Sequence, residues 1–473
     1  MNRRRLTIAA TSAALVIAAA GCGGDDSTGD VAATSEVTTT DAPSTTTTVD
    51  ATTSTTEATT TTTTVDDGWK DEAAAACAAV AAEVGAQPGP EASMGEVVAF
   101  WRDVRERLPW LDELDLPDEL RSPPTDIPAV MREADDHLAS AEAAAAAGDD
   151  DTAHLERVRY TSLLEHSAAL VTVAGAECGN PARAANASLN VPVPSALQLA
   201  VGFDSVWVSQ SRFTTVVRVD PDSGELLATI DVGEAPFKAQ AADGRMIVRG
   251  VDAYTAIDPA TDTVVATLPK SEVGPAANRS WAIDGAMWIC DGPRVHRYDP
   301  ATFEPTGTTI ELDIDCGQVY ATPELVIAWV YNDDAGESGI AAAAFIDPAT
   351  DEVLATTPLP VDVTVPIVLE DTVYFPGNGG TQNVVVDRST WAIIATPDYG
   401  RQVGGSEMTY DGQFIYLIAD RIDVLVVDTE SFEVTDTIEP LTIIAQLNAL
   451  AYTPGALWTV NGDAGILQRF DTQ

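Results

Sequence analysis

The residues of this chain best suited to recognise a ligand by charge are two cations in its C-terminal half. Lys238 lies five residues before an Asp-Gly pair that begins at Asp243. Arg279 lies five residues before the equivalent pair at Asp284, so the two cations occupy matching places in a repeat. Together with Glu407, they are the candidate residues of a ligand-binding rim that would take an anion or an acidic sugar. The alternative is that both cations only balance nearby carboxylates.

The motifs of the common enzyme classes are missing from the sequence. The Gly-x-Ser-x-Gly motif fails at residues 404–408, and no phosphate-binding loop or dinucleotide fingerprint occurs. His296 is the single histidine after residue 187, and no spacing of His or Cys fits a metal site. We therefore predict a non-enzymatic binding module without metal or cofactor. The alternative is a lyase or hydrolase that uses His296, Glu407 and their basic neighbours.

The first residues of the chain are typical of a secretory signal. Three arginines precede residue 6, an apolar run spans residues 6–20, and Ala19-Ala20-Gly21-Cys22 follows. Small residues directly before a lone cysteine resemble the lipobox of bacterial lipoproteins. The resemblance implies that residues 1–21 are removed and that Cys22 carries acyl chains such as palmitate, which would anchor the protein to the extracytoplasmic face of the cell membrane. The alternative is an ordinary secretory signal with an incidental cysteine.

The amino-acid composition indicates the kind of organism the chain comes from and the kinds of partner it can bind. Arginine far above lysine and abundant alanine, added to the lipobox, fit a high-GC bacterium such as an actinobacterium. The chain carries 25 basic and 73 acidic residues, a formal net charge of −48, which repels nucleic acid. We expect a monomer whose partner, besides the membrane, is an envelope protein, peptide or glycan. Residues 22–68 are rich in Thr and Ser and predict a disordered stalk, with O-glycosylation left open.

Helical periodicity covers residues 69–180. Apolar residues recur at steps of three and four in residues 95–108, and an Ala-rich run spans residues 69–84. Two longer helices, 127–147 and 151–174, are each followed by a glycine. Four helices predict a small four-helix bundle, separate from the rest of the chain.

From residue 187 to residue 473 the period changes to two, and one pattern recurs. An apolar run ends in Asp at seven places whose spacings are 38, 41, 48, 40, 41 and 43: Asp220, Asp258, Asp299, Asp347, Asp387, Asp428 and Asp471. A hydrophobic strand such as SVWVS at Ser205 precedes each of them. A period near 40 residues with four short strands per copy predicts a β-propeller of seven blades.

One copy also resembles a known repeat. SVWVSQSRFTTVVRVDPDSGELLATIDVG, residues 205–233, is similar to the YVTN-type repeat of surface and cell-envelope propellers, which belong to the WD40-like superfamily. The resemblance extends over about residues 189–473 and implies a mainly β protein with a seven-bladed propeller behind the α domain. That family contains binding modules as well as enzymes, so it leaves the function open.

Three details of the propeller are predicted as well. The last copy lacks a fourth strand, and the segment 188–193 should supply it and close the ring. The repeated Asp residues should form turns rather than a catalytic or calcium site. Buried tryptophans should pack between blades, at Trp207, Trp288, Trp329 and Trp458. An acidic insertion at 332–337 is interpreted as a solvated loop, with a calcium site as the alternative.

Four cysteines remain besides Cys22, and an even number in an oxidising compartment predicts two disulfides. Three pairings are possible. We favour Cys77 with Cys178, which would tie the first helix to the end of the last one. Cys290 with Cys316 would then join adjacent blades, because both residues are predicted on the same rim of the propeller.

Overall fold

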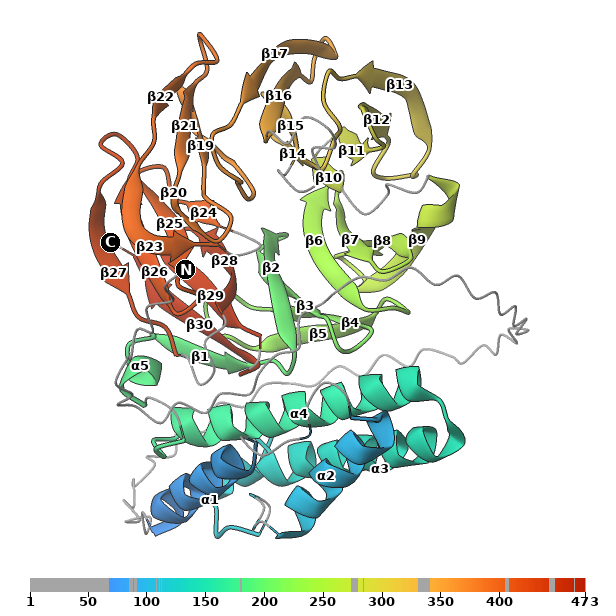
Figure 1. The fold of residues 1–473 in the computed structure, drawn as a ribbon, viewed down its shortest axis with the longest axis vertical. Helices are drawn as coiled ribbons and strands as arrows, with labels where there is room; N and C mark the ends of the chain where they lie inside the picture. Colours follow the sequence, from blue (N-terminus) through green and yellow to red (C-terminus); the bar gives the residue numbers. More distant parts are fainter. Residues whose placement is uncertain are drawn as a thin grey trace, which may run out of the picture.

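Seven antiparallel sheets follow one another in chain order around a central axis (Figure 1). The computed structural model describes residues 68–84, 88, 92–107, 109, 111, 113–178, 181–273, 280–283, 285–330, 341–404, 408–441, 447–462 and 464–472. It confirms the seven-bladed propeller. Residues 1–67, which include Cys22 and the stalk, lie outside the described residues, as do Arg279, Glu407 and the insertion at 332–337.

Each of the first four blades is a four-stranded meander, and its strands run outward from the axis in chain order. The strands of blades 1 and 2 are β2 (Ala196–Gly202), β3 (Ser205–Gln210), β4 (Thr215–Val219), β5 (Leu226–Asp231), β6 (Pro236–Ala242), β7 (Arg245–Gly250), β8 (Ala253–Asp258) and β9 (Thr263–Pro269). Those of blades 3 and 4 are β10 (Ser280–Ile283), β11 (Ala286–Cys290), β12 (Arg294–Tyr298), β13 (Pro305–Glu311), β14 (Gln318–Ala321), β15 (Val326–Val330), β16 (Ala342–Asp347) and β17 (Glu352–Pro358).

The remaining blades depart from this plan. Blade 5 contains β18 (Ile367–Val368), β19 (Thr372–Phe375), β21 (Val384–Asp387) and β22 (Ile393–Ala395). Blade 6 contains β23 (Asp398–Val403), β24 (Thr409–Tyr410), β25 (Phe414–Ala419), β26 (Asp423–Asp428) and β27 (Val434–Ile438), and it also gains β20 (Gly380–Gln382) from the connection between β19 and β21. Blade 7 contains β28 (Leu447–Thr453), β29 (Ala456–Asn461), β30 (Ile466–Asp471) and, from the other end of the domain, β1 (Leu189–Pro192).

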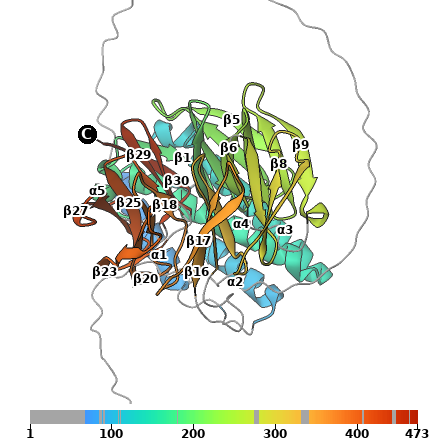
Figure 2. The ribbon, with the colours of Figure 1, turned by 90° about the horizontal axis from the view of Figure 1, so that it is seen from above.

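The ring is closed by β1, as predicted. β1 pairs antiparallel with β30, so that Leu189 lies opposite Arg469 and Pro192 opposite Ile466 (Figure 1, Figure 2). Val191 on this strand is 2% exposed and packs in the cluster that joins blades 7 and 1. β1 covers the edge of β30, which the last blade would otherwise expose, and its pairing ties the first strand of the propeller to the last.

Six of the seven repeated Asp residues, all except Asp471, form turns. The carboxylate of Asp220 accepts hydrogen bonds from the backbone N–H groups of Asp222 and Ser223 at 3.0 and 2.7 Å. Asp387 does the same and also accepts from the hydroxyls of Ser389 and Thr390, and these hydrogen bonds lower its pKa to about 2. A carboxylate that accepts this many hydrogen bonds is held as an anion in a hairpin and is structural.

Each neighbouring pair of blades shares one hydrophobic cluster. The four strand tryptophans named from the sequence lie in these clusters, and each is at most 1% exposed. The prediction that they pack blade against blade is therefore confirmed.

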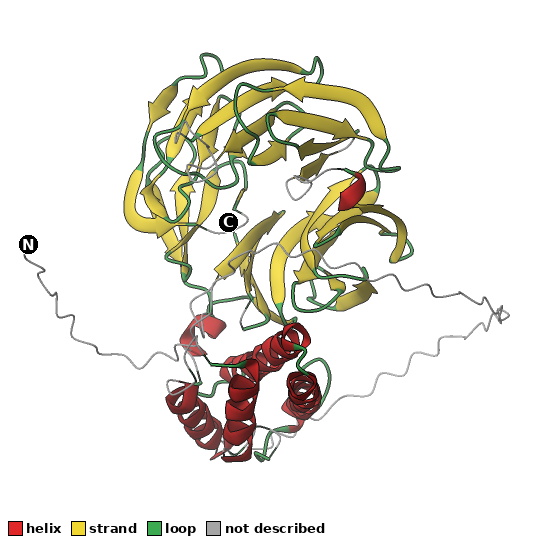
Figure 3. Cartoon of the chain, turned by 45° about the vertical axis from the view of Figure 1, so that its right-hand side comes forward, coloured by secondary structure: helices red, strands yellow, loops and turns green. Residues whose placement is uncertain are grey.

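Helices precede the propeller close to the predicted places: α1 (Gly68–Val84), α2 (Met94–Arg107), the 3-10 helix η1 (Asp118–Arg121), α3 (Ile127–Ala147), α4 (Asp150–Val173) and α5 (Pro181–Ala185); a second 3-10 helix, η2 (Lys270–Glu272), follows β9. Gly148 ends α3 with φ of 78°, a left-handed conformation that glycine adopts without strain. Figure 3 shows the helices that precede the propeller gathered on one side of the ring of strands.

Helix α4 lies between the other helices and the propeller, and its residues 160–167 are all buried. Its Ser162 hydroxyl lies 2.6 Å from that of Ser195, directly before β2, and Arg159 Nε donates to the carbonyl of Arg212, after β3. The hydrophobic cluster of the helices also contains propeller residues Leu441, Ala464 and Ile466. This shared cluster packs the helices against blade 7.

The segment that connects the helices to the propeller packs against blade 6. The segment between residues 180 and 187, which the predicted helical region 69–180 and propeller 187–473 leave unassigned, contains α5. Arg183 forms an ion pair with Asp423 on β26 at 3.1 Å, and its guanidinium donates to the carbonyl of Ile422 at 3.2 Å. Such contacts hold the segment against blade 6.

Both predicted disulfides are present. Cys77 on α1 is bonded to Cys178, which follows α4, and Cys290 at the end of β11 is bonded to Cys316, which precedes β14. The Cα atoms of each pair are 5.4 Å apart. The first bond therefore fastens α1 to α4, and the second fastens blade 3 to blade 4.

Candidate functional site

A cavity of about 370 Å³ opens on one rim of the propeller. Its described lining comes from the first residues of innermost strands and the last residues of second strands, with two short loops of blade 5: Leu197, Gln198, Phe237, Lys238, Arg249, Ser280, Trp281, Gln318, Val319, Trp329, Thr364, Val365 and Asn378. Five consecutive blades contribute to it. Ligand sites commonly have volumes of about 300 to 1,000 Å³, so this cavity suits a small ligand or the end of a larger one.

Strand pairing brings the cavity residues together. Innermost and second strands are antiparallel, so the start of one lies beside the end of the next: Lys238 pairs with Arg249, and Gln318 pairs with Trp329. Innermost strands of a propeller all begin on the same rim, which collects these residues from separate blades. Lys238 is the third residue of β6, so it lies within the innermost strand of blade 2.

One aromatic ring that lines the cavity, the indole of Trp281, is already in contact with two neighbouring side chains. Lys238 Nζ lies over the ring of Trp281, 3.6 Å from the ring centroid. Tyr320 packs against the same indole with ring centroids 4.4 Å apart. The contact with the ring positions the Lys238 ammonium, because a cation is attracted to the face of an indole. Phe237, 40% exposed, is then the aromatic ring that the cavity offers to a ligand.

Two buried polar groups in the cavity wall have no hydrogen-bond partner among the described residues. They are the amide oxygen Oε1 of Gln198 and the indole Nε1 of Trp329. Gln198 is 7% exposed and Trp329 is 1% exposed. A buried polar group without a partner costs about 1–3 kcal/mol.

The described lining of the cavity carries charge of the opposite sign to that of the chain. Among the described lining residues, Lys238 and Arg249 are the charged side chains, and none is an acid or a histidine. The chain as a whole has a net charge of −48. The structure thus places Lys238 in a cavity, and adds Arg249, Gln198, Trp281 and Trp329, which sequence reasoning missed.

His296, which the lyase or hydrolase alternative requires, does not line the cavity. It is on β12, the third strand of blade 3. Its Nδ1 is 3.1 Å from the hydroxyl of Thr309 and its Nε2 is 3.6 Å from the carboxylate of Asp291. These contacts place it in a cross-strand polar cluster. They do not bring it to Lys238.

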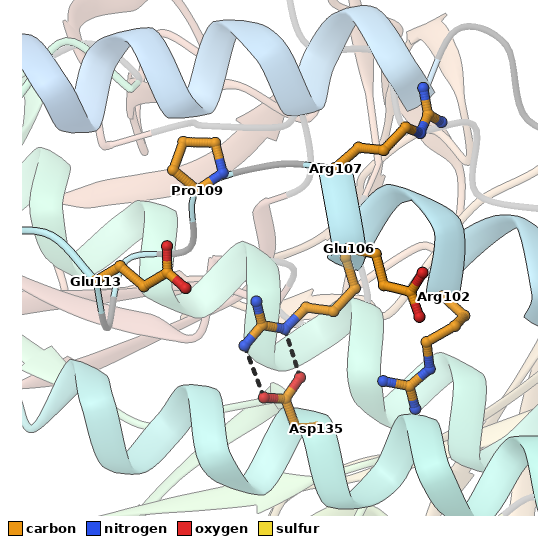
Figure 4. A pocket seen from close by; sticks show the side chains of 7 residues that line it. Arg102, Glu106, Arg107, Pro109, Glu113 and Asp135 are labelled. Carbon is orange, nitrogen blue, oxygen red and sulfur yellow. Dashed lines mark hydrogen bonds and ion pairs between the residues drawn. The ribbon is translucent and has the colours of Figure 1, made fainter.

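A second hollow, about 530 Å³, lies at the helices, between the end of α2 and α3 (Figure 4). Its cations already have acidic partners. Arg105 donates through Nε and a terminal nitrogen to both carboxylate oxygens of Asp135 at 2.7 and 2.8 Å, and Arg102 pairs with Glu142 in the same way. The bidentate pairs leave this hollow less suited to a charged ligand than the propeller cavity.

The described residues contain no group of three or more His, Cys, Asp or Glu side chains placed to hold a metal ion. No helix in the same part of the chain has the length and apolar character needed to cross a membrane.

Comparisons with known proteins concern the fold alone. No family model and no curated protein matches this chain. Among solved structures, hydrazine synthase of Kuenenia stuttgartiensis is 11% identical with a TM-score of 0.48, over 60% of this chain and 97% of that chain. BamB of Moraxella catarrhalis is 14% identical with a TM-score of 0.42, over 58% and 84%.

Proposed function

We propose that this protein is a lipid-anchored module of the bacterial cell envelope that binds a partner in the propeller cavity and does not turn it over. The composition of the cavity carries the proposal. Amide, aromatic and cationic side chains line it, which suits recognition, and the described lining offers no carboxylate or imidazole to act as general acid or base.

The N-terminal sequence supports the location. Cys22 after Ala19-Ala20-Gly21 would be acylated, and residues 22–68 would form a stalk that holds the folded part away from the extracytoplasmic face of the membrane. We infer that the helices form a four-helix bundle between stalk and propeller and that the repeats are of the YVTN type. An actinobacterial source and a monomeric state belong to the same proposal.

Photo-crosslinking on intact cells tests the binding function. A photoreactive benzoylphenylalanine replaces Phe237, which lines the cavity, and in a matched control it replaces Val265, 48% exposed on the outermost strand β9. We expect discrete crosslinked products from position 237, none of the same size from position 265, and their loss when Lys238→Glu is added.

Two results would refute the proposal. One is the same set of crosslinks from both positions, which would show that the cavity is not the binding surface. The other is turnover of an ester, peptide or lactone substrate that is abolished by His296→Asn, which would favour the lyase or hydrolase alternative.

A further inference from the structure

The strand that closes the propeller is also the strand of the ring that comes first after the helices. β1 pairs with β30 over four residues, Leu189–Pro192. Under the proposed function the chain before it leads to an acylated Cys22, so a pull on the anchor travels along the chain towards β1. A short strand that is pulled from one end loses its pairs one after another. Tension on the anchor therefore threatens ring closure unless it leaves the chain before β1.

The Cys77–Cys178 disulfide shortens the path of such a pull. The two cysteines are 101 residues apart in sequence and enclose α2, α3 and α4 in a covalent loop. A pull that arrives at α1 crosses from Cys77 to Cys178 and does not stretch the three helices between them. The tension then reaches the segment that connects Cys178 to β1.

Arg183 of α5 fastens this connecting segment to blade 6. Its guanidinium lies 3.1 Å from the carboxylate of Asp423 and 3.9 Å from that of Glu439, and it donates to the carbonyl of Ile422 at 3.2 Å. The side chains of Arg183 and Asp423 are 17% and 11% exposed. Charge-assisted hydrogen bonds are stronger than neutral ones, and partly buried ion pairs are screened by salt much less than exposed ones.

The position of Arg183 in the chain puts it between the disulfide and the closing strand. Asp423 begins β26 of blade 6, whereas β1 belongs to blade 7, so the two attachments are on different sheets. A further hydrogen bond joins them, from Asn190 Nδ2 on β1 to the carbonyl of Ala184 at 3.1 Å. A pull on the connecting segment therefore meets blade 6 before it meets the pairing of β1 with β30.

We propose that α5 is a latch that protects ring closure from tension: Arg183 transfers a pull on the anchor to blade 6 before it peels β1 from β30. The proposal rests on the membrane anchor of the proposed function and gives the segment between helices and propeller a mechanical role. The alternative is that Arg183 contributes only to stability at rest.

Optical tweezers at constant force test the latch on the unacylated chain that begins at Cys22. One handle is attached to the Cys22 thiol and the other to Val265→Cys, 48% exposed on β9, since the four remaining cysteines are in disulfides. We expect Arg183→Met to shorten the time before the first extension about tenfold, because it removes the charge-assisted contacts. The matched control Arg294→Met removes an ion pair with Glu311 on blade 3 and should leave this time unchanged.

A second arrangement of handles separates the latch from a contribution to stability at rest. In a chain with Cys22→Ser, both handles are placed on the propeller, at Val265→Cys and at Leu354→Cys, which is 45% exposed on β17. The tension then does not pass through α5. Arg183→Met should leave the time before the first extension unchanged here.

Removal of the disulfide tests the other half of the path. Cys77→Ser with Cys178→Ser places α2, α3 and α4 in series with the anchor. We expect an added extension of up to about 35 nm before β1 leaves β30, since the 101-residue separation extends by about 3.5 Å per residue.

Three results would overturn the proposal: equal times for Arg183→Met and wild type when the chain is pulled from Cys22, equal shortening in both arrangements of handles, or no added extension without the disulfide. If Arg183→Met does not fold, Arg183→Lys, which keeps the charge but loses the planar fork, should shorten the time only when the chain is pulled from Cys22. Failure of the latch is distinguishable from failure of the proposed function, because crosslinks from position 237 and membrane attachment through Cys22 are measured separately.

Discussion

The junction of helix α4 and blade 7 should make the protein sensitive to acid through one histidine. His166 is 1% exposed, and its Nδ1–H donates to the carbonyl of Ala464 at 3.0 Å. Gly465, next to that carbonyl, approaches the ring so closely that an added Cβ would lie 2.8 Å from Nδ1. Burial of the ring lowers the pKa of His166 to about 4, since the hydrogen bonds to Ala464 and Gly465 offset only part of the desolvation.

The direction in which stability changes with pH follows from which state, folded or unfolded, binds the proton more tightly. An unfolded histidine titrates near 6.5. Between about pH 6.5 and 4, His166 is therefore protonated in the unfolded chain and neutral in the folded chain. The stability contribution of the neutral ring is therefore complete above pH 6.5 and is lost as the pH falls towards 4. One pKa unit corresponds to about 1.4 kcal/mol, so this group should lower the free energy of unfolding by about 2 kcal/mol between pH 7.5 and 5.0.

Urea denaturation at pH 7.5 and 5.0, followed by tryptophan fluorescence, measures the effect. In His166→Asn the amide nitrogen can still donate to Ala464, but the side chain no longer titrates. We expect the stability of this variant to fall by about 2 kcal/mol less than that of wild type between the two pH values. His154→Asn, at an exposed position on the same helix, is the control and should follow wild type more closely. Identical pH dependence of His166→Asn and wild type would refute the reasoning, because it would mean that the ring is not held neutral between helix and propeller.

Two further predictions concern anchoring and ring closure. Cys22→Ser should release the protein from membranes into the medium and abolish labelling with palmitate, and equal membrane fractions for variant and wild type would disprove the anchor. Val191→Ala with Val193→Ala removes four buried methyl groups beside β30 and should lower the free energy of unfolding by about 3–5 kcal/mol. The control Val264→Ala with Val265→Ala, on the exposed outer strand, should cost less than about 1 kcal/mol; a closing-strand variant no less stable than this control would show that β1 is dispensable.

The architecture of the propeller could be predicted from the sequence because it depends on local patterns that repeat. Each copy places an alternating strand before an Asp turn, so the same short-range rules act seven times. The incomplete last copy identified β1 as its missing strand. The cysteine positions relative to the predicted helices and rims identified both disulfides. All of these depend on order along the chain, which the sequence contains directly.

The cavity and the contact between helix α4 and the propeller could not be predicted from the sequence, because they depend on which distant segments meet. Gln198 and Trp329 are 131 residues apart, and nothing near either residue indicates that both line one cavity; only closure of the ring brings them there. Helix α4 contains polar residues such as Ser162 and His166 that an amphipathic pattern would assign to solvent. They are buried because the propeller covers the side of α4 that the other helices leave open. Local periodicity specifies how a segment folds, whereas the environment of a side chain is set by every element packed around it.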